Sequence, residues 1–317
     1  MYLYVLMGTL NLKLGIVLLL GMLLFSSCSI IPQGESADST SSILSQVQSG
    51  TRGIEIDFVS SYPPATLYDV GDMVMLLEVE NKGAYDVGGA DCYLQVTGFD
   101  SNIIRGIDYV QSCGPVDGKN VYNLDGGWNQ VEYSSSSITL PDDTLEYSPN
   151  LNLVWCYEYQ TIANPSICVD PLFYQITSEQ KACSPQDVGM GGGQGGPVSV
   201  TYTGVDMIGD TAVFEISVQN SGGGRVLSPY ADISNCGESV LDYEDLDRVG
   251  YTIEMTGGSM IECTPSNGLL RLSNDVGKIV CSFRINGQSA YETPLQITLD
   301  YNYIESTQQG IQIISTP

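Results

Sequence analysis

The chain has 317 residues, and its 37 Asp and Glu side chains far outnumber its 11 Lys and Arg side chains, giving a formal net charge of -26. A surface with so few bases repels the phosphates of nucleic acids, so no nucleic-acid partner is expected. The absence of histidine excludes Ser-His-Asp and Cys-His catalytic centres and most catalytic zinc sites.

The N-terminus carries a short apolar run, Leu14–Phe25, preceded by Lys13. Its length is typical of a signal-peptide core and falls short of the about 20 apolar residues that a membrane span needs. The segment Leu24–Cys28 that closes the run resembles a lipobox, although Phe25 stands where that pattern usually has Leu. We therefore expect a lipid on Cys28 and a membrane partner for the N-terminus.

Residues 1–27 are accordingly expected to be a signal peptide or membrane anchor, and a start at Met7 would shorten them. An uncleaved anchor is one alternative, although extending the span back through Tyr2–Leu10 would bury Lys13 at a cost of about 2.5–3.5 kcal/mol. Ordinary soluble secretion is the other. The first interpretation predicts a location at the cell surface, on the extracytoplasmic face of the membrane.

The polar composition of residues 28–53 predicts a flexible tether after the lipidated Cys28, and the glycines of 187–197 predict a linker. Between and after them lie two blocks of ordinary domain size, 54–186 and 198–317. Apolar residues alternate with period two in both blocks, as in Met73/Met75/Leu77/Val79 and Ala212/Phe214/Ile216/Val218. This pattern predicts strands, and helical spacing is confined to short stretches near Ile43–Val47 and Val240–Leu246.

The two blocks resemble each other at two places, in the same order. The segment Gly71–Gly83 matches Gly209–Gly222, and Leu151–Tyr159 matches Leu295–Tyr303. We therefore expect an all-β chain of two tandem β-sandwiches of one fold.

The run Gly71-Asp72-Met73-Val74, followed by Val79-Glu80-Asn81-Lys82-Gly83-Ala84, resembles the CARDB-like and related archaeal S-layer-like modules. The resemblance covers about Ile54 to Val87 well and the second block more weakly. It implies immunoglobulin-like β-sandwiches of the kind repeated in cell-surface proteins, which are generally not catalytic.

The cysteines are expected to form disulfides. The chain has no CxxC pair, which is the spacing that would indicate a metal site. Setting Cys28 aside from the nine cysteines leaves eight: Cys92, Cys113, Cys156, Cys168, Cys183, Cys236, Cys263 and Cys281. Closeness in sequence and an expected hairpin at Ala163–Ser166 favour the pairs Cys92–Cys113, Cys156–Cys168 and Cys263–Cys281, which leaves Cys183–Cys236 as a bridge between the blocks. The alternative pairs Cys168 with Cys183 and leaves Cys156 for another partner.

One acidic cluster, in the second block, is a candidate calcium site because hard oxygen ligands at short spacing suit Ca²⁺. Its members are Asp242, Glu244, Asp245 and Asp247. It lacks the glycine and the distal Glu of an EF-hand loop, and a solvated acidic loop explains it equally well. No other cofactor is expected.

Tyrosines form two groups. Those at equivalent repeat positions are expected to be structural: Tyr157, Tyr159, Tyr301 and Tyr303. The others considered could form a contact surface for glycan or protein: Tyr62, Tyr68, Tyr122, Tyr133 and Tyr230.

These features together predict a non-catalytic, membrane-tethered cell-surface protein that serves in adhesion or display, with other surface proteins or glycans as partners. One alternative is a structural subunit of an S-layer-like sheet or surface filament, assembled by strand addition. Another is an accessory lipoprotein that binds a small ligand.

Overall fold

The computed structural model describes residues 36–316 except 176–179, 236 and 238–240. The chain divides into two units, Met1–Ser42 and Ile43–Pro317. Of the first unit only Ser36–Ser42 is described, so the signal sequence and the proposed lipid site at Cys28 lie outside the described residues.

A helix, α2 (Ser36–Val47), occupies much of the segment for which a flexible tether was predicted. Ile43 and Val47 stand four residues apart and therefore share one helix face, and Val47 is buried. The short helical spacing at Ile43–Val47 therefore belongs to a longer helix within the predicted tether. No helix in the described part of the chain is long and apolar enough to span a membrane.

The regular structure in the rest of the described chain is β-strand, in several sheets, as the sequence predicts. The first sheet has the order β1 (Ile54–Phe58), β3 (Val74–Asn81), β7 (Trp128–Ser134). The largest has the order β18 (Leu269–Arg271), β16 (Arg248–Met255), β20 (Tyr291–Gly310), β10 (Asn150–Ala163), β4 (Cys92–Thr97), β6 (Val110–Ser112), with β11 (Ser166–Val169) and β15 (Arg225–Leu227) also on β20.

Three smaller assemblies complete the described strands. One has the order β12 (Val188–Gly189), β13 (Val198–Ile208), β14 (Thr211–Asn220), β19 (Val276–Ile285), β17 (Gly258–Thr264). The others are β2 (Thr66–Tyr68), β21 (Gln312–Ile314), β9 (Glu146–Tyr147) and the pair β5 (Ile104–Arg105), β8 (Ser137–Ile138).

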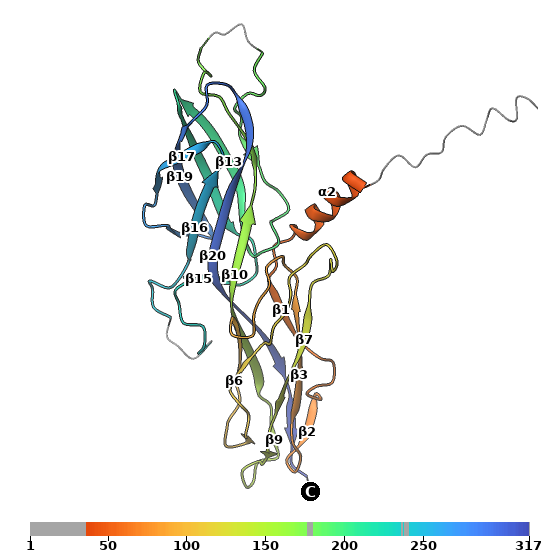
Figure 1. Cartoon of the computed structure of the whole chain (residues 1–317). Helices are drawn as coiled ribbons and strands as arrows, with labels where there is room; N and C mark the ends of the chain where they lie inside the picture. The colour runs from red at the N-terminus through yellow and green to blue at the C-terminus, as the bar shows by residue number, and fades with distance from the viewer. Residues whose placement is uncertain (1–35, 176–179, 236, 238–240, 317) are drawn as a thin grey trace, which may run out of the picture. The chain divides into compact units, whose positions relative to one another are not determined.

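The two long strands β10 and β20 join the blocks that the sequence separated (Figure 1). They pair antiparallel from Asn150↔Gly310 to Ala163↔Ile297. Beyond β20, β21 lies between β2 and β9, two strands of the first block. Both blocks therefore share one sheet within the unit Ile43–Pro317, and the glycine segment does not separate their strands into independent sheets.

The core consists of the alternating apolar residues that the sequence marked. Met75, Leu77 and Val79 on β3 and Phe214 and Ile216 on β14 are fully buried. Since successive strand residues point to opposite faces, each strand turns one apolar face inward.

The C-terminal part of the predicted linker 187–197 is buried, whereas Gly189, Gly191 and Gly192 are exposed. Gln194 to Val200 are buried, and Gly195 has a positive φ of 74°. A Cβ on Gly196 would lie 2.3 Å from Thr161 Oγ1 and 2.9 Å from the Tyr301 hydroxyl oxygen. Glycine is present here because the backbone passes directly against buried side chains.

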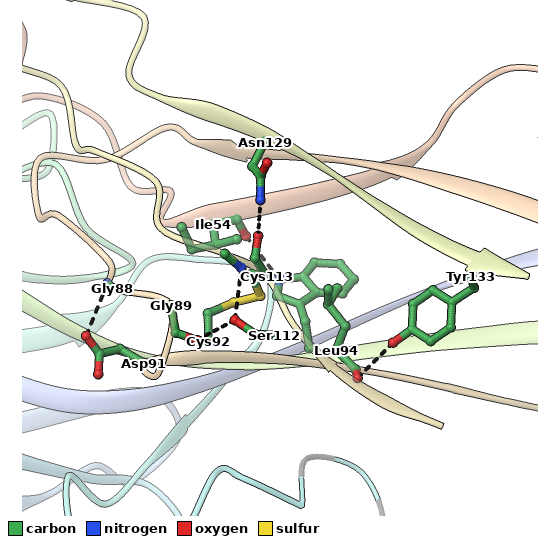
Figure 2. The surroundings of a disulfide bond; sticks show 12 residues. Ile54, Gly88, Gly89, Asp91, Cys92, Leu94, Ser112, Cys113, Asn129 and Tyr133 are labelled. Atoms are coloured by element: carbon green, nitrogen blue, oxygen red, sulfur yellow. Dashed lines mark hydrogen bonds between the residues drawn. A yellow bond between two sulfur atoms is a disulfide. The ribbon is translucent and has the colours of Figure 1, made fainter. Parts of the chain in front are cut away.

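Two disulfides confirm the pairs predicted from sequence: Cys92–Cys113, with Cα atoms 5.3 Å apart, and Cys263–Cys281, with Cα atoms 4.1 Å apart. Next to the first, the Cys113 N–H donates to the Cys92 carbonyl at 3.0 Å, and the side-chain amide Nδ2 of Asn129 donates to the Cys113 carbonyl at 2.7 Å (Figure 2). Disulfides indicate an oxidising, extracytoplasmic environment.

The third described bond joins Cys168 to Cys183, so the predicted pairs Cys156–Cys168 and Cys183–Cys236 are wrong. The reason is that β10 and β11 follow one another along β20 and do not fold back as a hairpin. Cys156 is opposite Ile304 and Cys168 is opposite Glu292, which places the two cysteines about 40 Å apart along the strand. Cys156 is disulfide-bonded as well.

Candidate functional site

A loop after β11 is closed by the Cys168–Cys183 bond, with Cα atoms 6.0 Å apart. β11 itself pairs with the first residues of β20, so Cys168 is fixed to the sheet opposite Glu292. The disulfide therefore ties Cys183 back to the strand that carries Cys168, and we refer to residues 168–183, of which 176–179 are not described, as the stapled loop.

An ion pair holds the stapled loop next to its disulfide. The Asp170 carboxylate is only 1% exposed, and its Oδ2 lies 2.5 Å from Lys181 Nζ. Lys181 Nζ also donates to the Leu172 carbonyl at 2.8 Å, and the Leu172 N–H donates to Asp170 Oδ1 at 3.0 Å. The buried carboxylate is thus both charge-compensated and hydrogen-bonded, as a buried charge must be to be stable.

Two aromatic side chains extend from this support. The Lys181 ammonium lies 5.9 Å from the centroid of the Phe173 ring, and the Phe173 and Tyr174 rings meet edge to face at 4.9 Å. The Tyr174 side chain is 76% exposed. Exposed aromatic side chains offer a large contact area at a low cost in conformational entropy, which suits recognition.

A cavity of about 240 Å³ lies beside the Asp170–Lys181 pair. Its wall also includes Leu172 and the uncharged polar residues Gln288 and Ser289, which lie in the loop before β20. Phe173 and Tyr174 were not among the predicted site residues. The available signal was the placement of Asp170 and Lys181 two residues inside the two cysteines.

The four tyrosines predicted to be structural are indeed buried, and they face each other across the central strand pair. Tyr157 is in register with Tyr303 and Tyr159 with Tyr301, and their ring centroids are 5.7 Å and 6.2 Å apart. Burial raises the pKa of all four phenols above their ordinary value, so they remain neutral donors at physiological pH.

Each of these hydroxyls has a specific partner. Tyr159 donates to Asn81 Oδ1 at 3.2 Å and Tyr303 donates to Asn220 Oδ1 at 2.8 Å. Asn81 and Asn220 end the two matched strands β3 and β14. The repeat seen in sequence therefore recurs as the same contact in both blocks.

One of the candidate calcium residues is engaged with a cation of the chain itself. Asp247 accepts two hydrogen bonds from Arg225, at 3.2 and 3.0 Å. Among the described residues, which include Asp242, Glu244, Asp245 and Asp247, no group of three or more carboxylates, histidines or cysteines is placed to hold a metal ion. Asp247 is instead the partner of a nearby cation.

Of the tyrosines considered for a contact surface, four are exposed, namely Tyr62, Tyr68, Tyr122 and Tyr230. Tyr133 is fully buried, and its hydroxyl donates to the Leu94 carbonyl at 3.0 Å (Figure 2). It occupies an inward position of β7, whose alternation was not analysed from sequence.

No protein-family model and no curated protein sequence matches this chain. Among solved structures it is similar to the C-terminal globular domain of an oligosaccharyltransferase from Pyrococcus abyssi (8% identity, TM-score 0.23, covering 84% of this chain and 50% of that one). It is also similar to the secreted serine protease VesC from Vibrio cholerae (10%, 0.20, 81% and 51%) and to the CupB6 tip adhesin from Pseudomonas aeruginosa (10%, 0.19, 84% and 99%).

The chain spans about half the length of the first two of these proteins. At TM-scores this low, none of the three likenesses bears on the fold or function of this chain.

Proposed function

We propose that this protein is a non-catalytic display module of the cell surface, tethered to the membrane through Cys28, which presents the stapled loop to a partner. The observation that carries the proposal is the support of Phe173 and Tyr174 by a disulfide and a buried ion pair. A recognition loop gains from such support, because a pre-ordered surface loses less entropy on binding.

The framework fits this role. Strands β10 and β20 pair over fourteen positions, so a load applied at one block is carried by many backbone hydrogen bonds to the other. The repeated Asn–Tyr contact supports the further proposal that each block is an immunoglobulin-like sandwich of the CARDB type. Protein partners or glycans both suit an exposed tyrosine flanked by uncharged polar groups.

Two measurements test the proposal. Mass spectrometry of the native N-terminus is expected to find a lipid on Cys28, and protease treatment of whole cells is expected to release the remainder of the chain. An intact N-terminus beginning at Met1 or Met7 would refute the lipid anchor.

The role of the loop is tested by adherence of cells that display the full chain. Replacing Phe173 and Tyr174 together by Ser is expected to reduce the adherence of these cells to the partner surface at least several-fold. The matched control is Tyr230→Ser, since Tyr230 is 84% exposed but lies outside the stapled loop. Equal adherence of the loop variant and the control would reject the loop as the presenting element.

A further inference from the structure

The two blocks differ at one position where their repeat is otherwise close. Tyr157 and Tyr301 are matched residues of the repeat, and each reaches a residue of the opposite long strand. The Tyr301 hydroxyl is 2.8 Å from Thr161 Oγ1, whereas the Tyr157 hydroxyl donates to Glu305 Oε1 at 2.9 Å. Thr161 is 1% exposed. A neutral buried hydroxyl in one half is therefore replaced by a carboxyl group in the other.

The surroundings of these matched positions also differ. In the first block, the glycine segment packs against the chain after Asn81: the Ala84 N–H donates to the Gly195 carbonyl at 2.7 Å. Gly223 is the counterpart of Ala84 after Asn220. A Cβ on Gly223 would meet no atom within 4 Å.

The open space beside Gly223 is a cavity of about 310 Å³. Its lining includes Thr51, Arg52, Glu55, Ser221, Gly223 and Glu305. In the first block the corresponding space is occupied by the contact between Ala84 and Gly195. In the second block it is open, and Glu305, which stands where the first block has Thr161, lies in its wall.

Glu305 forms no ion pair with a described residue, and the nearest cation in the cavity wall, Arg52, is bonded to Glu55. Glu55 is already paired with Arg52, and Arg225, on the other side of Glu305, is paired with Asp247. No Lys or Arg of the described residues forms an ion pair with Glu305. Burial raises the pKa of the Glu305 carboxyl, the hydrogen bond from Tyr157 lowers it, Glu55 raises it, and Arg52 lowers it. A half-buried carboxylate in this position is stabilised by an incoming positive charge.

The chemistry of the cavity selects the kind of cation. A hard divalent ion takes six or more oxygen ligands, whereas here one unpaired carboxylate is available and no group of three ligands is formed among the described residues. An ammonium group needs one carboxylate and neutral acceptors, and the Ser221 hydroxyl lies in the same wall. The net charge of -26 also concentrates cations at the surface.

We propose that the cavity at Glu305 is a binding site for a primary ammonium group on an aliphatic stem. The ammonium donates to the Glu305 carboxylate, and the stem lies along Gly223. The group can be supplied by a lysine side chain of a partner or by a free aliphatic diamine. This site is independent of the stapled loop.

The test is calorimetric titration of the full chain with two probes, 1,4-diaminobutane and a lysine blocked at its α-amino and carboxyl groups. Their uncharged counterparts, 1,4-butanediol and the Nε-acetylated lysine, serve as controls. The proposal is supported if either ammonium probe binds and its uncharged counterpart does not. The probe with the higher affinity shows whether a free diamine or a lysine side chain of a partner is the better ligand. Absence of binding by both ammonium probes overturns it.

Two variants place the binding at this cavity. Glu305→Gln keeps an acceptor for Tyr157 but removes the charge, and is expected to weaken binding by about tenfold or more, in line with the loss of a charge-assisted hydrogen bond. Gly223→Leu fills the cavity without touching the carboxylate and is expected to abolish binding. Binding unchanged in a folded Glu305→Gln or in Gly223→Leu overturns the assignment. Should Glu305→Gln fail to fold, Gly223→Leu decides alone.

Discussion

Asn81 and Asn220 make the same hydrogen bonds at the ends of two different strands. In each, Oδ1 accepts from a tyrosine hydroxyl and from the N–H two residues ahead, Gly83 or Gly222. In each, Nδ2 donates to a carbonyl four residues ahead, at 2.7 Å for Asn81 and 3.0 Å for Asn220. The side chain therefore satisfies the backbone where the strand ends and turns.

Replacing either asparagine by Ala is expected to destabilise the fold by about 2–4 kcal/mol, because several buried groups lose their partner and each costs about 1–3 kcal/mol when left unsatisfied. Chemical denaturation of the two variants measures the loss. The control is Asn286→Ala, at an exposed loop position, which is expected to change stability by less than about 0.5 kcal/mol. A loss at Asn81 or Asn220 no larger than that of the control would show that these bonds do not stabilise the strand ends.

Two glycines of the segment 187–197 provide the second prediction, one as the test position and the other as its control. Gly196→Ala is expected to destabilise the fold by about 1–3 kcal/mol, since its Cβ would overlap Thr161 and force the core to shift. Gly191→Ala, in the same segment, would meet no atom within 4 Å and is expected to be neutral. Thermal melting of both proteins distinguishes a packed segment from a linker, for which both changes would be equally tolerated.

These two features show what the sequence could and could not predict. The alternation of apolar and polar residues identified strands such as β3 and β14, because a strand that buries one face has an apolar residue at every second position. The match of Gly71–Gly83 with Gly209–Gly222 anticipated the equivalence of Asn81 and Asn220. The glycine run was misjudged because the same composition serves a flexible linker and a backbone pressed against side chains, and only the neighbours distinguish the two.

Features set by long-range pairing were also beyond the sequence. The choice between a hairpin and a continuing strand after β10 decided the partner of Cys168, and that choice depends on β20, more than a hundred residues further on. Likewise, Glu305 became notable only when its contact with Tyr157 could be compared with that of Thr161 and Tyr301.

The ion pair of the stapled loop provides a third prediction. Lys181→Met is expected to destabilise the loop by about 3–5 kcal/mol, because it leaves the buried Asp170 carboxylate without a counter-charge. Lys278→Met is the matched control, since Lys278 pairs with Glu215 at the surface with side chains 55% and 48% exposed, and its loss is expected to cost about 1 kcal/mol or less.

Hydrogen exchange across residues 168–183 measures the effect locally. Adding Asp170→Asn to Lys181→Met should recover part of the lost protection, because the uncompensated charge is removed. A double variant less protected than the single one would contradict this explanation.

The remaining disulfide is predicted to join Cys156 to Cys236. Six cysteines are bonded to each other and Cys156 is bonded too, which leaves Cys28 and Cys236 as candidates. Ile233 packs against Cys156, and a Cβ on Gly237 would lie 3.4 Å from Val154 Cβ, on the same strand. Peptide mapping without reduction is expected to recover a Cys156–Cys236 peptide. This disulfide would join the first block to the second. Recovery of Cys236 as a free thiol would contradict this pairing.

The pH dependence of stability gives a last prediction, at Glu305. The pKa of this carboxyl is raised by burial above its value in the unfolded chain, so the folded state binds the proton more tightly. Its contribution to the free energy of unfolding is therefore fully present below the unfolded pKa and is lost as the pH rises through the folded pKa. Glu305→Gln, which is neutral at every pH, lacks this loss.

The difference in unfolding free energy between Glu305→Gln and the parent chain should thus become more positive from about pH 3, below the ordinary pKa of a glutamate, to about pH 7. Measuring the difference cancels the other carboxyls, including Glu158, whose pKa burial also raises. Saturating 1,4-diaminobutane should reduce the difference at neutral pH, because the ammonium stabilises the ionised Glu305 of the parent only. A difference that is flat with pH would show that Glu305 titrates in the folded chain as it does in the unfolded one.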